Sequence, residues 1–228
     1  MAKYTWLLFD ADDTLFDYGQ AEAGALRQTF EQSGVHFEPS YLETYQSINR
    51  QLWHEFEQGK ITSELLRTRR FELLFAAIGV LIDVSIFSPR YLTNLAAGSE
   101  LTEGALEVVQ ALGSKYHLAI ITNGLRDVQR PRLAGSAIRD YIELIVISEE
   151  VGAVKPDTAI FDAAFRLMGN PGKGQVLMIG DSLTSDMAGG HHYGIDTCWF
   201  NPHGQPRPDH VTIHYEIKRL AELVEMLA

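Results

Sequence analysis

The stretch KYTWLLFD at residues 3–10 decides the fold, because it is the first of several short apolar runs of the same kind. Its aromatic and aliphatic residues predict a buried strand that ends at Asp10. Four further apolar runs follow in the second half of the chain, at residues 117–122, 144–147, 176–179 and 195–200. Helical patterns lie between these four runs, and strands that alternate with helices indicate a parallel sheet covered on both faces.

Residues 18–98 have a different pattern. Apolar residues recur there at steps of three and four, and Gly34, Gly59 and Gly79 end three helical stretches. Pro89 divides a shorter apolar stretch, so we expect four or five helices and no strand in this segment. An isolated strand is not stable, so the first strand must pair with the later ones. The sequence therefore predicts an α/β fold, with a Rossmann-like parallel-sheet core at residues 1–15 and 99–228 and an all-helical cap inserted at residues 16–98.

The composition narrows the classes of function. The 228 residues are 46% hydrophobic and 21% charged, which is typical of globular proteins. The net charge of −11 opposes binding to a nucleic acid polymer or an anionic membrane, and the apolar runs are shorter than a membrane-spanning helix requires. The single cysteine, Cys198, excludes an intrachain disulfide and a cysteine zinc cluster. We therefore expect a cytoplasmic protein with a small-molecule partner.

Polar residues follow several of the predicted strands, at the edge where open α/β sheets bind their ligands. In chain order they are Asp10, Asp12, Thr122, Asn123, Lys155, Asp181 and Asp186. Asp10 and Asp12 are two residues apart, and in an extended segment such residues point to the same side. Two carboxylates aimed at one point repel each other unless a cation separates them. With Asp181 as a third member, the set suits Mg²⁺, and Mn²⁺ is chemically compatible with the same oxygen ligands.

The same residues suit phosphate chemistry. A carboxylate such as that of Asp10 can attack phosphorus and form an aspartyl phosphate. Lys155 offers a positive charge and Thr122 a hydroxyl donor to the phosphoryl group. Asp12 can protonate the leaving oxygen and later take a proton from water. Together these residues suffice for a two-step hydrolysis of a phosphate monoester.

Four stretches resemble the motifs of the haloacid dehalogenase superfamily: FDADDTL at 9–15, IITNG at 120–124, Lys155-Pro156 and GDSLTSD at 180–186. The helical insertion after the first motif resembles the C1 cap of that superfamily. The resemblance implies that Asp10 is the nucleophile and Asp12 the acid and base. It implies that Asp10, Asp181 and the backbone carbonyl of Asp12 bind Mg²⁺. It also implies that Asp186 supports the metal site or Lys155 without being a metal ligand itself. Thr122, Asn123 and Lys155 are then expected to hold the phosphate.

Several short stretches, less distinctive than the four motifs, are similar to bacterial pyrimidine 5′-nucleotidases of the YjjG type. They are FDADDTLF at 9–16, Leu52-Trp53 with residues 59–63, VISEEVG at 146–152 and TCW at 197–199. This resemblance implies hydrolysis of pyrimidine nucleoside monophosphates. We expect the protein to be a monomer or a weak homodimer. Candidate specificity residues are Phe16, Trp53, Phe56, Gly59 and Lys60. Trp53 and Phe56 suit either the core of the cap or a platform on which a base stacks.

Other functions remain open at this point. A sugar-phosphate or phosphoglycolate phosphatase, or a mutase of the β-phosphoglucomutase kind, would use the same Asp10 and Asp12. A dehalogenase needs no acid for its leaving group, so Asp12 argues against that activity. A phosphate-sensing receiver-like protein would also use an aspartate, a threonine and a lysine, but it would leave Asp12 and the large cap unexplained.

Overall fold

The computed structural model describes residues 3–207 and 211–228, which form two compact units. The first unit contains Met1–Tyr18, Ser99–Arg126 and Leu133–Ala228, and the second contains Gly19–Gly98 and Asp127–Arg132. The second unit begins slightly later than the predicted cap and includes one segment that we expected in the core. Contacts explain this addition: Arg132 Nη2 donates to the carbonyl oxygen of Leu95 at 3.3 Å, and Arg67 Nη1 lies 3.1 Å from Asp127 Oδ2.

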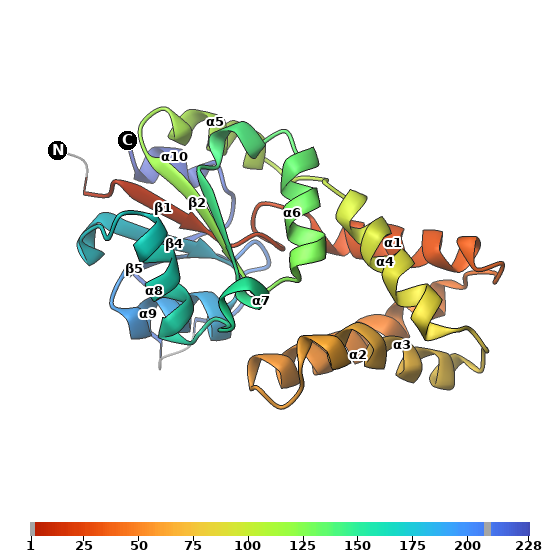
Figure 1. Ribbon diagram of the computed structural model, residues 1–228. Coiled ribbons are helices and arrows are strands. Elements are labelled where there is room, and N and C mark those ends of the chain that lie inside the picture. The colour runs from red at the N-terminus through yellow and green to blue at the C-terminus, as the bar shows by residue number, and fades with distance from the viewer. Residues whose placement is uncertain (1–2, 208–210) are drawn as a thin grey trace. The chain divides into compact units, whose positions relative to one another are not determined.

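The first unit is built on a six-stranded sheet in the order β3-β2-β1-β4-β5-β6. All five strand pairs are parallel, and β1 lies in the middle (Figure 1). The strands are β1 (Trp6–Phe9), β2 (His117–Thr122), β3 (Leu144–Ile147), β4 (Val176–Gly180), β5 (Asp196–Phe200) and β6 (Tyr215–Ile217). The first five correspond to the predicted runs within two or three residues, and β6 is an additional edge strand.

Both faces of the sheet are buried. On one face, Leu7 and Phe9 of β1 pack in a core with α5 (Ala105–Gly113) and α10 (Glu222–Met226). On the other face, Leu8 packs in a core with α8 (Thr158–Leu167) and with Tyr193, the last residue of α9 (Ala188–Tyr193). Figure 1 shows these helix pairs on opposite sides of the sheet. The predicted Rossmann-like α/β fold is confirmed, because alternate residues of each central strand are buried against different helices.

The remaining elements of this part of the chain are short connections. They are the 3₁₀ helices η1 (Arg139–Tyr141) and η2 (Lys173–Gln175), α7 (Ser148–Val151) and the π-helix η3 (Leu183–Met187). The helix α6 (Arg126–Gly135) has only its two ends in this unit, because Asp127–Arg132 belongs to the second unit. The sequence predicts one continuous helix over residues 183–191, whereas the structure has η3 followed by α9. No helix among the described residues combines the length and the apolar character that crossing a membrane requires.

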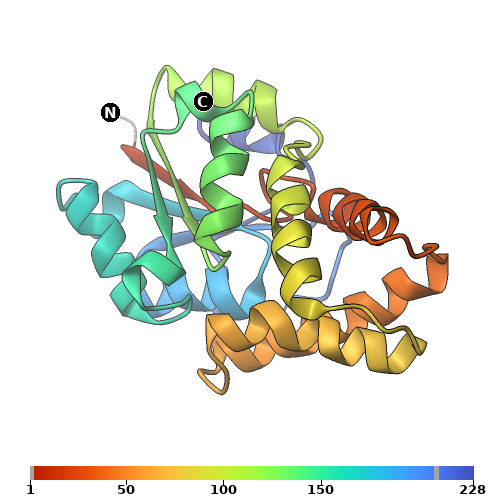
Figure 2. The same ribbon diagram turned by 45° about the vertical axis from the view of Figure 1, so that its right-hand side comes forward.

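Besides the middle of α6, the second unit contains four helices, α1 (Tyr18–Gln32), α2 (Pro39–Glu57), α3 (Ser63–Ile78) and α4 (Val84–Ala97), coloured red-orange to yellow in Figure 2. Its core is aromatic: the rings of Phe30, Phe71, Phe75 and Phe87 pack edge to face. Pro89 lies inside α4 and does not divide it as expected. Proline removes one backbone hydrogen bond, and the buried residues on either side of it hold the helix together.

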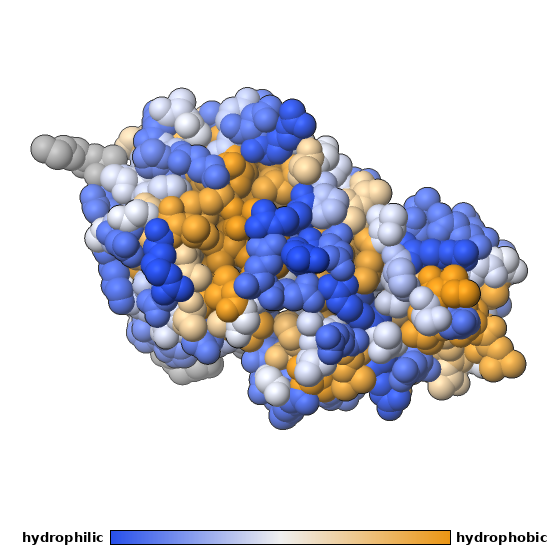
Figure 3. Space-filling model, in the orientation of Figure 1, coloured by the Kyte–Doolittle hydropathy of each residue, from blue (hydrophilic) through white to orange (hydrophobic). Residues whose placement is uncertain are grey.

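Apolar residues also reach the surface of this unit. Leu81 and Ile86 are exposed near the connection between α3 and α4, where Figure 3 shows an apolar patch.

Candidate active site

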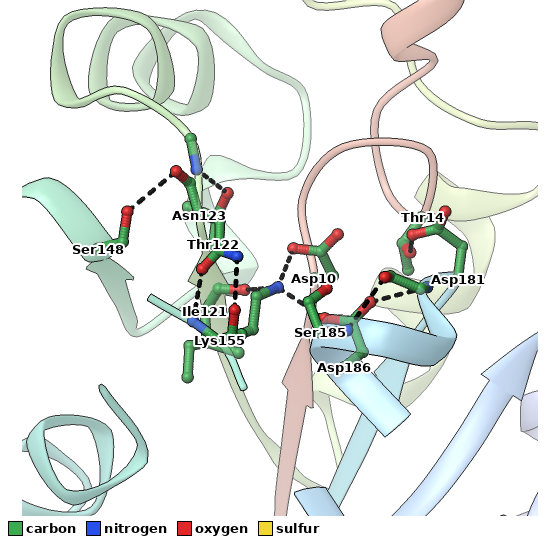
Figure 4. A network of polar contacts seen from close by, with 12 residues as sticks. Asp10, Thr14, Ile121, Thr122, Asn123, Ser148, Lys155, Asp181, Ser185 and Asp186 are labelled. Carbon is green, nitrogen blue, oxygen red and sulfur yellow. Dashed lines mark hydrogen bonds and ion pairs between the residues drawn. The ribbon is translucent and has the colours of Figure 1, made fainter. Parts of the chain in front are cut away.

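The carboxyl ends of the parallel strands bring the predicted polar residues together. Asp10 follows β1, Thr122 is the last residue of β2, and Asp181 follows β4. Phe9 pairs with Ile120 on one side and with Ile179 on the other, so these strands end at nearly the same level. Figure 4 shows the resulting network of polar contacts.

Lys155 is the centre of this network. Its Nζ donates to Asp10 Oδ1 at 2.5 Å, to Asp186 Oδ1 at 2.7 Å and to the carbonyl oxygen of Ile121 at 2.9 Å (Figure 4). The three acceptors match the three donors of an ammonium group, although only 2% of the side chain is exposed. Burial alone would lower the pKa of Lys155, but the charges of Asp10 and Asp186 outweigh it and raise the pKa. The lysine therefore stays charged at neutral pH.

Asn123 holds the backbone of Lys155 in place. Its Nδ2 donates to the carbonyl oxygen of Lys155 at 3.0 Å, and its Oδ1 accepts from the backbone N–H of Lys155 at 2.7 Å. Ser148 Oγ, at the start of α7, donates to the carbonyl oxygen of Asn123 at 2.9 Å. The sequence predicts that Asn123 holds phosphate, whereas the structure shows its amide engaged with the lysine backbone. Both polar ends of the amide thus position Lys155, and the role of Asn123 in holding phosphate stays a prediction.

Thr122 is almost completely buried beside this clamp. Its Oγ1 accepts a hydrogen bond from the backbone N–H of Gly124 at 3.0 Å. A hydroxyl that accepts in this way still has its own proton to donate. The position is therefore compatible with the predicted role as a donor to phosphate.

Asp186 depends on an unusual turn and on a glycine. It lies in η3, where its Oδ2 accepts from the backbone N–H of Ser182 at 3.0 Å while its Oδ1 binds Lys155. A Cβ atom on Gly180 would lie 2.3 Å from Asp186 Oδ2. Only glycine at the end of β4 therefore lets this carboxylate lie against the strand. π-helical turns are rare and often occur at functional sites.

Asp181 is fixed from two sides. Thr14 Oγ1 donates to its Oδ1 at 3.4 Å, and Trp199 Nε1 donates to its carbonyl oxygen at 2.9 Å. Burial, followed by the charges of Asp186 and Asp13, raises the pKa of Asp181 to about 7.

Three carboxylates meet at this edge of the sheet. Oxygen atoms of Asp10, Asp181 and Asp186 lie within 4.8 Å of one another. Burial raises the pKa of Asp10 well above its usual value, the charge of Lys155 lowers it, and the other two carboxylates raise it further. Because three carboxylates share one ammonium group, the cluster has an excess of negative charge and of oxygen donors. Both properties fit a divalent cation such as Mg²⁺.

The predicted metal ligands coincide only in part with this group. Asp10 and Asp181 belong to it. Asp186, which we expected to support the site without being a ligand, belongs to it as well. The role of Asp12 and its backbone carbonyl stays a prediction. Asp12 is partly exposed and lies next to a tight turn. In this turn Asp13 has a φ of 57°, and its backbone N–H donates to the carbonyl oxygen of Phe16 at 2.9 Å.

The five candidate specificity residues differ in their exposure. Phe16 is 1% exposed and belongs to the apolar core of the first unit, and its contact with substrate stays a prediction. Trp53 and Phe56 in α2 form an edge-to-face pair with ring centres 5.6 Å apart, and both are partly exposed. Gly59 has a φ of 67° just after α2, and Lys60 beside it is exposed.

Sequence reasoning missed three residues that act on this site. Trp199 appeared only as part of the TCW stretch, although its indole holds Asp181. Gly180 appeared only as part of a motif, without its steric reason, and Ser148 only within the VISEEVG stretch. None has a local pattern that reveals its partner, because each partner lies on another element.

Comparisons with known proteins agree with this geometry. Residues 7–200 match the family model of haloacid dehalogenase-like hydrolases. The chain is 35% identical to the pyrimidine 5′-nucleotidase YjjG of Escherichia coli over 225 residues, covering 99% of this chain and 98% of YjjG. It is 36% identical to the pyrimidine 5′-nucleotidase PynA of Streptococcus pneumoniae, covering 98% and 95% of the two chains.

A solved structure is similar over almost the whole chain. The HAD-hydrolase YfnB of Bacillus subtilis, in a crystal structure described as bound to magnesium, is 36% identical and has a TM-score of 0.92. The match covers 99% of both chains. The match to the family model and these full-length relatives lead to one conclusion: the chain belongs to the haloacid dehalogenase-like hydrolase family.

Proposed function

We propose that this protein is a Mg²⁺-dependent phosphomonoesterase that hydrolyses pyrimidine nucleoside 5′-monophosphates through an aspartyl phosphate. The observation that carries the proposal is the buried Lys155, which joins the carboxylates of Asp10 and Asp186 beside Asp181. The nucleotide substrate is supported by two relatives of 35% and 36% identity that are named pyrimidine 5′-nucleotidases.

The carboxylates of Asp10 and Asp181 would hold the metal ion, together with the backbone carbonyl of Asp12. Asp186 lies close enough to support them. A bound Mg²⁺ ion would neutralise negative charge between the nucleophile and the phosphoryl oxygens. The magnesium described for the YfnB structure supports this choice of ion. Mn²⁺ prefers similar oxygen ligands and is expected to substitute.

The remaining chemistry belongs to the side chains. Asp10 attacks phosphorus in line and forms the aspartyl phosphate. Lys155 and the hydroxyl of Thr122 stabilise the charge that spreads over the phosphoryl oxygens. Asp12 protonates the departing nucleoside oxygen, then takes a proton from the water that hydrolyses the aspartyl phosphate. Asn123 contributes by fixing the backbone of Lys155.

The first experiment measures phosphate release from UMP, dUMP, dTMP, ribose 5-phosphate and phosphoglycolate, with Mg²⁺, with Mn²⁺ and with EDTA. We expect metal-dependent release that is fastest from the pyrimidine nucleotides. Release from ribose 5-phosphate or phosphoglycolate alone would refute the nucleotide substrate and keep the phosphatase. Absence of release from every substrate would refute both.

A matched pair of variants tests the nucleophile. Asp10→Asn should reduce kcat by about three orders of magnitude or more, because the amide cannot attack phosphorus. Asp140→Asn is the control, since the Asp140 side chain in η1 is 78% exposed. Substantial activity in Asp10→Asn, with the control unchanged, would contradict the assignment.

We also propose that Trp53 and Phe56 take part in base selection, since both rings are partly exposed rather than buried in the core of their unit. Stacking on an aromatic side chain stabilises a base by about 1–3 kcal/mol. Trp53→Ala should therefore lower kcat/KM for dUMP by roughly tenfold and leave kcat/KM for ribose 5-phosphate unchanged. Equal losses with the two substrates would show that Trp53 only supports the fold.

A further inference from the structure

Trp199 links β5 to the residue that follows the neighbouring strand. In the sheet register Gly180 pairs with Trp199, so the indole lies beside the point where β4 ends. Its Nε1 donates to the carbonyl oxygen of Asp181 at 2.9 Å, and only 1% of the residue is exposed. An indole N–H can only donate, and a buried one usually requires a partner.

The packing around the indole fixes its direction. Trp199 forms a small apolar cluster with Met187 and Ile213, and partly buried Leu183 and Val211 pack against it. Leu183 and Met187 are the first and last residues of η3, the π-helix that contains Asp186. Both ends of η3 therefore take part in the packing around the ring, Met187 as a member of the cluster and Leu183 against it, and a rigid ring in this cluster holds its N–H at one place.

The hydrogen bond acts on the peptide group of a carboxylate residue. Asp181 has the carboxylate that meets those of Asp10 and Asp186. Fixing its carbonyl oxygen restricts the rotation of its backbone, and this restriction sets the direction in which the side chain leaves the chain. Metal sites depend on such outer contacts, and loss of one commonly weakens metal affinity.

We propose that Trp199 is a positioning residue for the metal-binding carboxylate of Asp181, and that its indole N–H prepares the site for Mg²⁺. The inference rests on the proposed metal site. It assigns to Trp199 an effect on metal affinity that is separate from its effect on packing.

The test separates the N–H from the ring. Trp199→Phe keeps an aromatic ring and removes the donor, while replacement of Trp199 by 3-benzothienylalanine keeps the size and shape and exchanges only the N–H for sulfur. Mg²⁺ binding to EDTA-treated protein is measured by isothermal titration calorimetry, and urea unfolding follows the stability. Trp6→Phe is the control, because Trp6 is the first residue of β1, at the opposite end of the sheet, and stacks on His117.

We expect both Trp199 replacements to weaken Mg²⁺ binding by roughly 2- to 10-fold, the range for one hydrogen bond. Activity should return toward the wild-type kcat at saturating Mg²⁺, since the defect lies in metal affinity. The control should bind Mg²⁺ as the wild type does. If Trp199→Phe does not fold, the benzothienyl variant decides.

Two outcomes overturn the inference. Wild-type Mg²⁺ affinity in the benzothienyl variant would show that the N–H does not prepare the site. A loss of kcat that saturating Mg²⁺ does not restore would show a structural role instead. Failure of the wild-type protein itself to bind Mg²⁺ would refute the proposed metal site, which is distinguishable from both.

Discussion

Substitution of Gly180 by alanine is the most direct test of how the site is built. The new Cβ would lie 2.3 Å from Asp186 Oδ2 and 2.4 Å from Asp186 Cγ. Real Cβ atoms essentially never come closer than 3.0 Å to such neighbours, so the carboxylate must retreat by at least about 0.7 Å. Gly180 has an ordinary φ, so the effect is purely steric.

The magnitude follows from what holds Asp186. Its side chain is fully buried and binds Lys155 Nζ at 2.7 Å and the backbone N–H of Ser182 at 3.0 Å. Overpacking costs about 1–3 kcal/mol, and weakening a hydrogen bond to a charged group costs about 1.5–3 kcal/mol. We therefore expect the free energy of unfolding to fall by about 3–5 kcal/mol. Displacing a partner of Lys155 should also reduce kcat/KM by about 100-fold.

Urea unfolding and steady-state kinetics measure the two effects. Gly24→Ala is the matched control, because Gly24 lies in α1 and a Cβ there meets no atom within 4 Å. Alanine in that helix should raise the free energy of unfolding by about 0.5–1 kcal/mol. The reasoning would be refuted by a Gly180→Ala protein with wild-type stability and activity.

Three further predictions concern other parts of the same unit. Burial raises the pKa of Cys198 to about 12. A thiol reagent at pH 8 should therefore label the urea-unfolded protein at once, but the folded protein only as fast as the fold opens. Rapid labelling of the folded protein would contradict this prediction. Burial alone would raise the pKa of Asp196, but hydrogen bonds from Lys3 and Tyr4 outweigh it and lower the pKa below its usual 3.8. The ionised carboxylate of Asp196 therefore stabilises the folded protein above pH 3.8. The difference in free energy of unfolding between the wild type and Asp196→Asn, measured with urea, should disappear as the pH falls through the folded-state pKa. A difference that does not change with pH would argue against this prediction. Asp157 caps α8, because its Oδ1 accepts a hydrogen bond from the backbone N–H of Ala159 at 2.9 Å. Asp157→Ala should therefore lower the free energy of unfolding by about 1 kcal/mol. An unchanged midpoint of urea unfolding would show that the cap is dispensable.

The sequence predicts the larger elements well because their signals are local. The run at residues 117–122 became β2 and that at 144–147 became β3, with the same bounds. β6 was missed because a three-residue edge strand with Glu216 at its centre has no pattern that separates it from a loop. η3 was missed because the spacing of apolar residues does not distinguish a single π-helical turn from the start of an α-helix.

The site was predictable at the level of strand ends and unpredictable at the level of side-chain direction. Strand topology brings Asp10, Asp181 and Lys155 together, and the motifs name them correctly as neighbours. Asn123 has the same place in the motif whether its amide faces a ligand or the backbone of Lys155. Phe16 lies next to the first motif, yet the turn after Asp12 directs it into the core. Both outcomes depend on rotation about single bonds, which distant residues decide.

The central position of β1 has a consequence for synthesis on the ribosome. Leu8 pairs with Ala119 on one side and with Met178 on the other, and both are translated more than a hundred residues after it. The four helices α1–α4 need mainly local contacts, so they can form while β1 still lacks neighbours. A nascent chain that stops before residue 176 contains neither β4 nor Asp181. The proposed nucleophile thus leaves the ribosome more than a hundred residues before either neighbouring strand, and it acquires its complete surroundings only when β2 and β4 have followed.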